Sequence, residues 1–220
     1  MRYTEVMSFE LNGVQIKTTL TNDVKVIDEH ILSFLQPTDN HRTKVIGFDM
    51  EWRPPSMLEP AIFQLCDGNS CLIFHLHPKN PVPLSLRNFL CQPNYTFVGC
   101  GIKDNFDYLK KRSGTGCKNA VELGTLAATL MDKPHLGFCG VDELAFVVNK
   151  LDLRKYRPLN LTFNWGYYPV SEELAKLATV NVYSYYNIGS ALFEREDLRA
   201  FGALTKDIYL IPRALAGLEL

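Results

Sequence analysis

Short segments in which apolar residues recur with the period of a β-strand constrain the fold of this chain more than any other feature. Residues 5–11 and 14–20 lie on either side of Asn12-Gly13, the dipeptide most typical of a two-residue β-hairpin turn. The remaining strand-like segments are residues 44–52, 61–66, 71–76, 96–102 and a short one near Val121. The pattern predicts a β-sheet at the centre of the fold.

Helix-like segments follow the first strands and separate the later ones. They are residues 24–35, 84–91, 104–112, 125–131, 141–149 and 171–193. Antiparallel strands followed by alternating strands and helices predict an α/β fold with a mixed sheet flanked by helices, and we expect five strands in it. The chain has 220 residues and shows no repeat or low-complexity linker, so we expect a single domain over residues 1–220.

Composition excludes several classes of protein. Lys+Arg is 23 against Asp+Glu 24, a formal net charge of −1, which excludes a nucleic-acid binder that works by bulk positive charge. No stretch approaches the roughly 18 consecutive apolar residues of a membrane span, so we expect no membrane partner. The six cysteines form no zinc-binding pattern, and free thiols indicate a reducing compartment, cytoplasmic or nuclear.

Asp49 and Glu51 are the most informative pair of charged residues. They close the segment 44–52, and residues two apart on a strand point to one face, so both carboxylates project together. Like charges held so close are unfavourable unless a cation lies between them, and oxygen ligands suit Mg²⁺ or Mn²⁺. The spacing alone does not distinguish such a metal site from the acidic end of an exposed strand.

A second pattern consists of segments whose order and spacing hold over nearly the whole chain. These segments are Gly47–Trp52, Ala61–Cys66, Val98–Leu109, Val121–Leu123, Asn164–Gly166, Val182-Tyr183 and Ile188-Gly189. Together they resemble the 3′–5′ exonuclease branch of the RNase H-like superfamily, most closely the Werner-type exonuclease domain and its plant relatives. The resemblance implies an RNase H-like fold, a single-stranded RNA or DNA 3′ end as partner, and Mg²⁺ or Mn²⁺ held by four acids. It also implies a homo-oligomer, which plant relatives can form.

The alignment with that family departs from its acid set at two of four positions. Asp49 and Glu51 match the first motif. The family's G-x-G-I-x-x-D motif falls on residues 99–105, so Asn105 stands where the third acid belongs. In the last motif Asn181 replaces the fourth acid, and Leu177 replaces the Tyr or His that orients the attacking water. The resemblance therefore implies a degenerate metal site.

The loss of two acids bears directly on the chemistry. Two divalent ions about 4 Å apart repel by roughly 17 kcal/mol at an effective dielectric constant of about 20, and Asp49 and Glu51 supply only half of the balancing charge. An Asn amide oxygen still ligates a hard cation weakly, so we expect one weakly bound Mg²⁺ or Mn²⁺ at most. Leu177 neither orients nor deprotonates water, and we expect weak or absent hydrolysis of 3′ ends.

Two alternatives stay open at this point. Asp104 and Asp107 flank Asn105, and a one-residue shift of the helix start would turn Asp104 inward and give an active Mg²⁺-dependent exonuclease. The other alternative is a catalytically dead homo-oligomer that serves as a scaffold or regulatory subunit.

Four residues are candidates for nucleic-acid contact. Trp52, next to Glu51, can stack on a terminal base, and Lys103, Lys110 and Lys111 can contact phosphates. An ordinary rim aromatic and ordinary solvated lysines would explain the same residues equally well.

Overall fold

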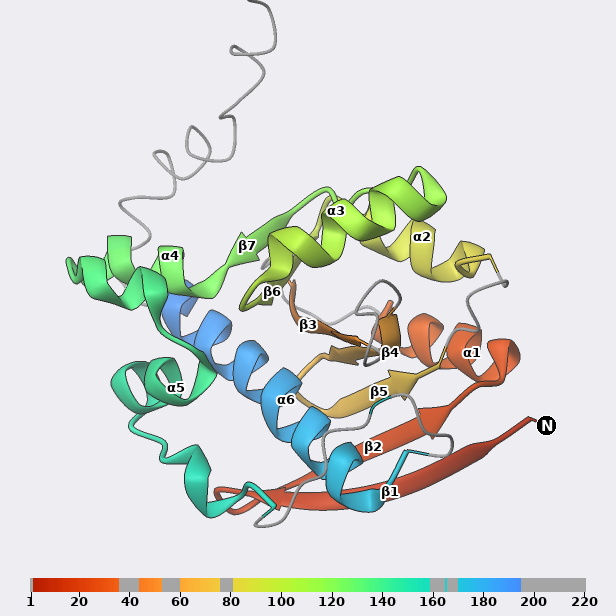
Figure 1. Cartoon of the computed structure of the whole chain (residues 1–220), viewed down its shortest axis with the longest axis horizontal. Coiled ribbons are helices and arrows are strands. Elements are labelled where there is room, and N and C mark those ends of the chain that lie inside the picture. The colour runs from red at the N-terminus through yellow and green to blue at the C-terminus, as the bar shows by residue number, and fades with distance from the viewer. Residues whose placement is uncertain are drawn as a thin grey trace, which may run out of the picture.

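A seven-stranded mixed sheet runs through the centre of the molecule (Figure 1). The computed structural model describes residues 2–35, 44–52, 60–75, 81–158, 165 and 170–194. Its strands are β1 (Thr4–Leu11), β2 (Val14–Thr21), β3 (Lys44–Trp52), β4 (Pro60–Cys66), β5 (Ser70–Phe74), β6 (Tyr95–Gly99) and β7 (Ala120–Glu122). They lie in the order β1-β2-β5-β4-β3-β6-β7.

The expectation of five strands was wrong because the N-terminal hairpin joins the sheet. The hairpin itself is confirmed: β1 and β2 pair antiparallel, and Asn12 and Gly13 both have positive φ angles, 52° and 80°. Residues Lys17–Thr21 of β2 then pair parallel with Ser70–Phe74 of β5. The hairpin thereby satisfies the backbone groups at an edge of the sheet that would otherwise stay open.

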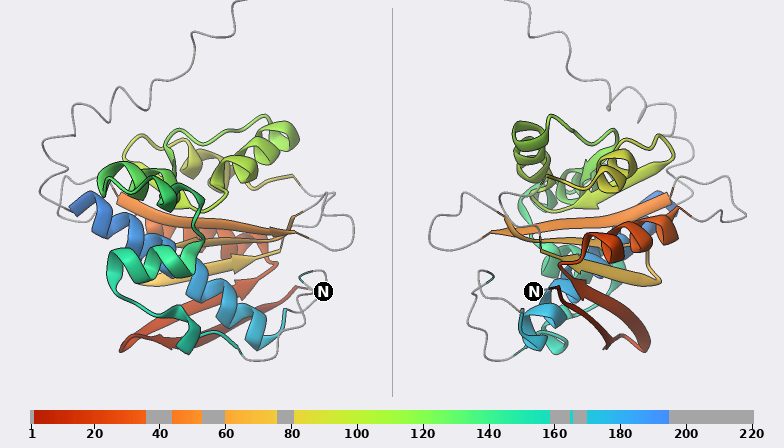
Figure 2. Two further views of the ribbon diagram at one scale, coloured as in Figure 1. Left: turned by 60° about the vertical axis from the view of Figure 1, so that its left-hand side comes forward. Right: turned by 90° about the vertical axis from the view of Figure 1, so that its right-hand side faces the viewer.

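Helices cover both faces of the sheet, as the sequence predicted (Figure 2). The helices are α1 (Val24–Phe34), α2 (Leu84–Leu90), α3 (Ile102–Ser113), α4 (Leu123–Leu130), α5 (Val141–Asn149) and α6 (Glu172–Glu194), with short 3-10 turns η1 (Pro134–Phe138) and η2 (Leu153–Lys155). One core cluster joins α1, α2 and α3 to the sheet through Ile31, Phe89, Phe106 and Phe48. No helix in the described ranges combines the length and apolar character needed to cross a membrane.

Helix α6 lies directly against β3 and β4 on the other face. A Cβ atom on Gly47 of β3 would lie 2.1 Å from the backbone oxygen of Val182 in α6, so this close approach requires glycine. Side chains alternate along β3, and therefore Asp49 and Glu51 share the face of Gly47. The packing of α6 on Gly47 thus places this helix beside the acidic end of β3.

Candidate functional site

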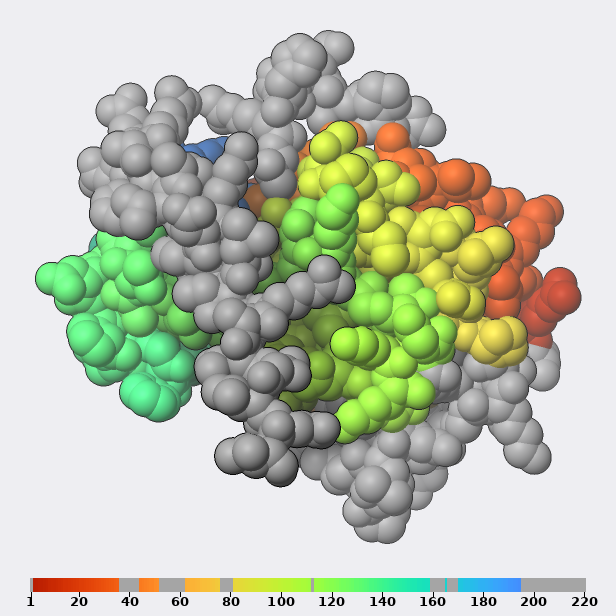
Figure 3. Space-filling view, turned by 90° about the horizontal axis from the view of Figure 1, so that it is seen from above, coloured from red at the N-terminus to blue at the C-terminus, as the bar shows by residue number. Residues whose placement is uncertain are grey.

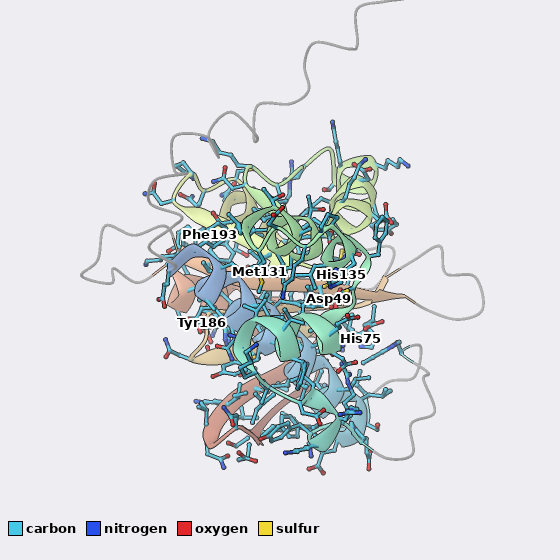
Figure 4. All side chains as sticks on the ribbon, turned by 90° about the vertical axis from the view of Figure 1, so that its left-hand side faces the viewer. Asp49, His75, Met131, His135, Tyr186 and Phe193 are labelled. Carbon is cyan, nitrogen blue, oxygen red and sulfur yellow. The ribbon has the colours of Figure 1, made fainter. Side chains whose placement is uncertain are left out.

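The site begins at the carboxyl end of β3, with Asp49 and Glu51 on the face covered by α6. Asp49 is buried, with 8% of its surface exposed, and Figure 4 shows it at the level of the strands. Glu51 is half-buried. Two neighbouring acids are therefore largely withdrawn from water, which is costly unless protons, hydrogen bonds or a cation compensate their charge.

Three donors from the protein contact the carboxylate of Asp49. Its Oδ1 accepts hydrogen bonds from the Met50 backbone N–H at 2.8 Å and from Asn105 Nδ2 at 3.4 Å. Its Oδ2 accepts from the Tyr185 hydroxyl at 3.3 Å. Both oxygens of Asp49 thus have partners within the chain.

Burial raises the pKa values of both acids. It raises the pKa of Asp49 to about 7, although the hydrogen bonds from Met50, Asn105 and Tyr185 act in the opposite direction. Burial, and then the charge of Asp49, raise the pKa of Glu51 to about 8. The pair therefore holds protons near neutral pH, and a cation must displace them to bind.

Asn105 reaches Asp49 because Glu122 fixes the start of α3. The helix begins after Gly101, which has a φ of 69°. The two carboxylate oxygens of Glu122 accept the backbone N–H groups of Gly101 and Ile102, each at 3.1 Å. This pair of hydrogen bonds caps the first turn of α3, and Asn105 lies one turn further on, buried against Asp49.

On α6, the two aligned positions have different surroundings. Leu177 is buried in an apolar cluster that includes Ile62 and Trp165. Asn181 is half-buried, and within the described residues its buried Oδ1 has no hydrogen-bond partner. The same is true of both amide atoms of Gln64, which lies opposite Asp49 in the β3–β4 pairing. These amide groups beneath α6 therefore keep unused hydrogen-bonding capacity, which water or an ion could satisfy.

The other candidate residues lie on the surface. Asp104 and Asp107 are exposed on α3, while Asn105 between them points inward. The same helix, which lies beside α2 in the view of Figure 3, carries three exposed lysines: Lys103, Lys110 and Lys111. Their side chains point to solvent, unlike that of Asn105, which contacts Asp49. Trp52 is the last residue of β3, and its side chain lies outside the described part of the molecule.

The chain offers few strong ligands for a metal. Across the described ranges, no three His, Cys, Asp or Glu side chains are grouped so that they could hold a metal ion. Glu122 lies nearby, but its oxygens are occupied by the backbone of α3. A cation beside Asp49 and Glu51 would depend on amide oxygens or water for its remaining ligands.

Sequence reasoning missed three residues of this site: Tyr185, Glu122 and Gln64. Tyr185 lies four residues after Asn181, which puts both on one helix face, and this spacing was a usable signal. The pairing of Gln64 with Asp49 depends on strand register, and the role of Glu122 depends on where α3 begins. Neither can be derived from local patterns.

In sequence, the chain is similar to two 3′–5′ exonucleases. No protein-family model matches it. It is 26% identical over 157 residues to the Arabidopsis thaliana protein RISC-interacting clearing 3′–5′ exoribonuclease 1, covering 68% of this chain and 78% of that protein. It is 25% identical over 202 residues to the mouse bifunctional 3′–5′ exonuclease/ATP-dependent helicase WRN, covering 90% of this chain and only 14% of that protein.

Solved structures share the fold at lower identity. Escherichia coli RNase D, an exoribonuclease, matches with a TM-score of 0.64 and 17% identity over 93% of this chain and 49% of its own. Brucella melitensis NrnC with bound Mg²⁺ matches with a TM-score of 0.60 and 12% identity over 78% of this chain and 82% of its own. The chain has the α/β fold of RNase H-like 3′–5′ exonucleases, which confirms the fold class that the sequence predicted.

Proposed function

We propose that this protein binds single-stranded 3′ ends of RNA or DNA and hydrolyses them weakly or not at all. The contact between Asn105 and Asp49 carries the proposal. A third acid at position 105 would present an oxygen to a shared cation, whereas the Asn105 amide donates a hydrogen bond to Asp49 Oδ1. The amide thus interacts with the buried carboxylate directly, and no cation is required between them.

The donor set fits one divalent ion and does not fit two. Asp49 and Glu51 supply two negative charges once they lose their protons, and the unpartnered Oδ1 of Asn181 is a candidate for a neutral oxygen ligand on α6. A bound Mg²⁺ or Mn²⁺ would supply a Lewis acid for a phosphate oxygen. Leu177, within its apolar cluster, supplies no group that accepts a proton from water. Hydrolysis then lacks both the second ion and the orienting group.

Binding of a nucleic acid is favoured by the relatives and by α3. The Arabidopsis relative is an exoribonuclease by name, the mouse relative an exonuclease, and NrnC has been solved bound to pGG. We assign phosphate contacts to Lys103, Lys110 and Lys111, and stacking on a terminal base to Trp52.

A nuclease and binding assay on the purified chain tests the proposal. We expect fluorescence anisotropy to show binding of a single-stranded oligonucleotide, and gel analysis with Mg²⁺ or Mn²⁺ to show no more 3′ shortening than the Asp49→Ala variant gives. Restoring acids with Asn105→Asp and Asn181→Asp together should increase shortening, because the pair supplies the missing charge.

Two outcomes would contradict the proposed function. Shortening by the natural chain that Asp49→Ala abolishes would show an active enzyme, and Asp104→Asn and Asp107→Asn would then test the flanking acids. Absence of binding to every RNA and DNA oligonucleotide would refute the binding function itself.

A second candidate function is that of a homo-oligomeric scaffold or regulatory subunit. The observation in its favour is the exposure of two large apolar side chains, Phe138 at 96% and Phe146 at 58%, near α5. Exposed aromatic side chains are enriched where proteins contact one another. Size-exclusion chromatography with light scattering decides: an oligomer without affinity for oligonucleotides favours the scaffold, and a monomer excludes the homo-oligomer.

A further inference from the structure

We infer that Tyr185 holds Asp49 as a hydrogen-bond acceptor and thereby competes with a divalent cation for that carboxylate. The inference rests on the proposed function, which it deepens by naming a residue that weakens the metal site independently of the missing acids. Its basis is the geometry around Asp49 Oδ2.

Tyr185 occupies the space that a cation on Oδ2 would need. Its hydroxyl lies 3.3 Å from Oδ2, and the residue is buried in α6. Mg²⁺ binds carboxylate oxygens at roughly 2.0–2.1 Å and demands near-octahedral coordination, usually with several waters. A hydroxyl so close to Oδ2 leaves little volume for an ion and its water shell unless the tyrosine moves.

The other oxygen of Asp49 is occupied as well. Its Oδ1 accepts from the Met50 N–H at 2.8 Å and from Asn105 Nδ2 at 3.4 Å. These donors and the Tyr185 hydroxyl together supply the positive partial charge that a buried carboxylate requires. Asp49 is thus partly compensated by the protein itself, and a cation on Oδ2 would share that oxygen with the Tyr185 hydroxyl.

The distances set the size of the expected effect. Strong charge-assisted hydrogen bonds have donor–acceptor distances of roughly 2.5–2.9 Å, shorter than the 3.3 Å from Tyr185 to Asp49. The Tyr185 contact is therefore of moderate strength. Its removal should tighten cation binding by about tenfold, which is the effect of a contact contributing about 1.4 kcal/mol.

Isothermal titration of the whole chain with Mn²⁺ tests the inference. At a pH above the raised pKa values of Asp49 and Glu51, where protons do not compete, we expect Tyr185→Phe, which removes only the hydroxyl, to bind Mn²⁺ about tenfold more tightly than the natural chain. Tyr183→Phe is the matched control: Tyr183 is buried on the same helix, but its hydroxyl bonds to Asn187. The control should leave Mn²⁺ affinity unchanged. Equal or weaker Mn²⁺ binding by Tyr185→Phe would overturn the inference.

A second measurement needs no variant of Tyr185 and so holds even if Tyr185→Phe fails to fold. In the natural chain with ¹³Cζ-labelled tyrosine, the NMR signal that moves in Asp49→Asn identifies Tyr185. We expect this signal to move when Mg²⁺ binds in large excess over protein, because the cation displaces the Tyr185 hydroxyl from Asp49. Mg²⁺ binding, measured by titration, that leaves the signal in place would contradict the inference.

The two proposals can fail separately. The metal titrations contain no nucleic acid, so they test the role of Tyr185 whether or not oligonucleotides bind. Conversely, an absence of oligonucleotide binding would refute the binding function, while the difference in Mn²⁺ affinity between the natural chain and Tyr185→Phe would still test the role of Tyr185.

Discussion

An amide at position 105 donates a hydrogen bond to a buried carboxylate in this protein. Asn105 and an aspartate have nearly the same shape, but the amide nitrogen donates to Asp49 where a carboxylate would repel it. Tyr185 also acts through one group, because its hydroxyl contacts the other carboxylate oxygen of Asp49, Oδ2. Small chemical differences at these two positions therefore determine which groups contact the Asp49 carboxylate.

His30 gives a prediction for the pH dependence of stability. The side chain lies in α1, with its Nε2 3.2 Å from the Ser70 hydroxyl and its ring edge-on to Phe34. Burial lowers the pKa of His30 from its ordinary 6.5, opposed by nearby Asp67 and assisted by Lys17. The unfolded chain thus binds a proton at higher pH than the folded one, so this residue's contribution falls as pH decreases through 6.5.

Urea denaturation at pH 5 and pH 8 measures this contribution. Asp49 and Glu51, with raised pKa values, act in the opposite direction in both proteins, so the comparison isolates His30. We expect the change in the free energy of unfolding from pH 8 to pH 5 to be more favourable in His30→Gln than in the natural chain. His135→Gln, at an exposed position of η1, serves as control and should keep the natural pH dependence. An unchanged pH dependence in His30→Gln would show that His30 makes no such contribution.

At the scale of elements, the approach of α6 to β3 builds the site. Gly47 lets the backbone of α6 come close to the strand, and a Cβ on Gly189 of α6 would lie 3.0 Å from a Val98 methyl and 3.1 Å from a Val45 methyl. Glycine on both elements brings the face of α6 that carries Asn181 and Tyr185 to the acidic end of β3. The cap that Glu122 provides to α3 positions Asn105 from the other side.

Gly47→Ala should therefore disturb both stability and the site. Because the added Cβ would lie 2.1 Å from the Val182 carbonyl oxygen, the backbone of α6 must move to relieve the overlap. We expect a loss of about 2–3 kcal/mol in the free energy of unfolding, measured by urea denaturation. Gly116→Ala is the matched control, since its Cβ would meet nothing within 4 Å. Equal effects of the two substitutions would refute the packing argument.

At the scale of the whole molecule, charge is nearly balanced, with a formal net charge of −1. Affinity for a polyanion must then come from a local group of cations. Lys110 and Lys111 are exposed near the end of α3, about 8–9 Å along the helix axis from Asn105. By contrast, Arg154 and Arg157 pair with Asp152 and Asp142 at 2.8 Å, which reduces the charge they offer to a phosphate.

Neutralising the two lysines tests this assignment. We expect Lys110→Gln with Lys111→Gln to weaken oligonucleotide binding about tenfold at low salt, and to make the dependence on salt concentration shallower. The control pair Lys17→Gln and Lys25→Gln removes the same charge from β2 and α1. A similar loss in both pairs would show that overall charge, and not α3, determines binding.

The order and type of the elements could be predicted from the sequence, because period-two and period-3.6 patterns are local properties of the chain. The spacing of Asp49 and Glu51 on one strand also predicted that their side chains share a face. Three features emerge only in the folded chain: the hairpin joins β5, Gln64 lies opposite Asp49, and Glu122 caps α3. Only tertiary packing brought Tyr185, 136 residues from Asp49 along the chain, within hydrogen-bond distance of it. Such contacts depend on strand register and on the approach of α6 to β3, which are set by packing between distant segments.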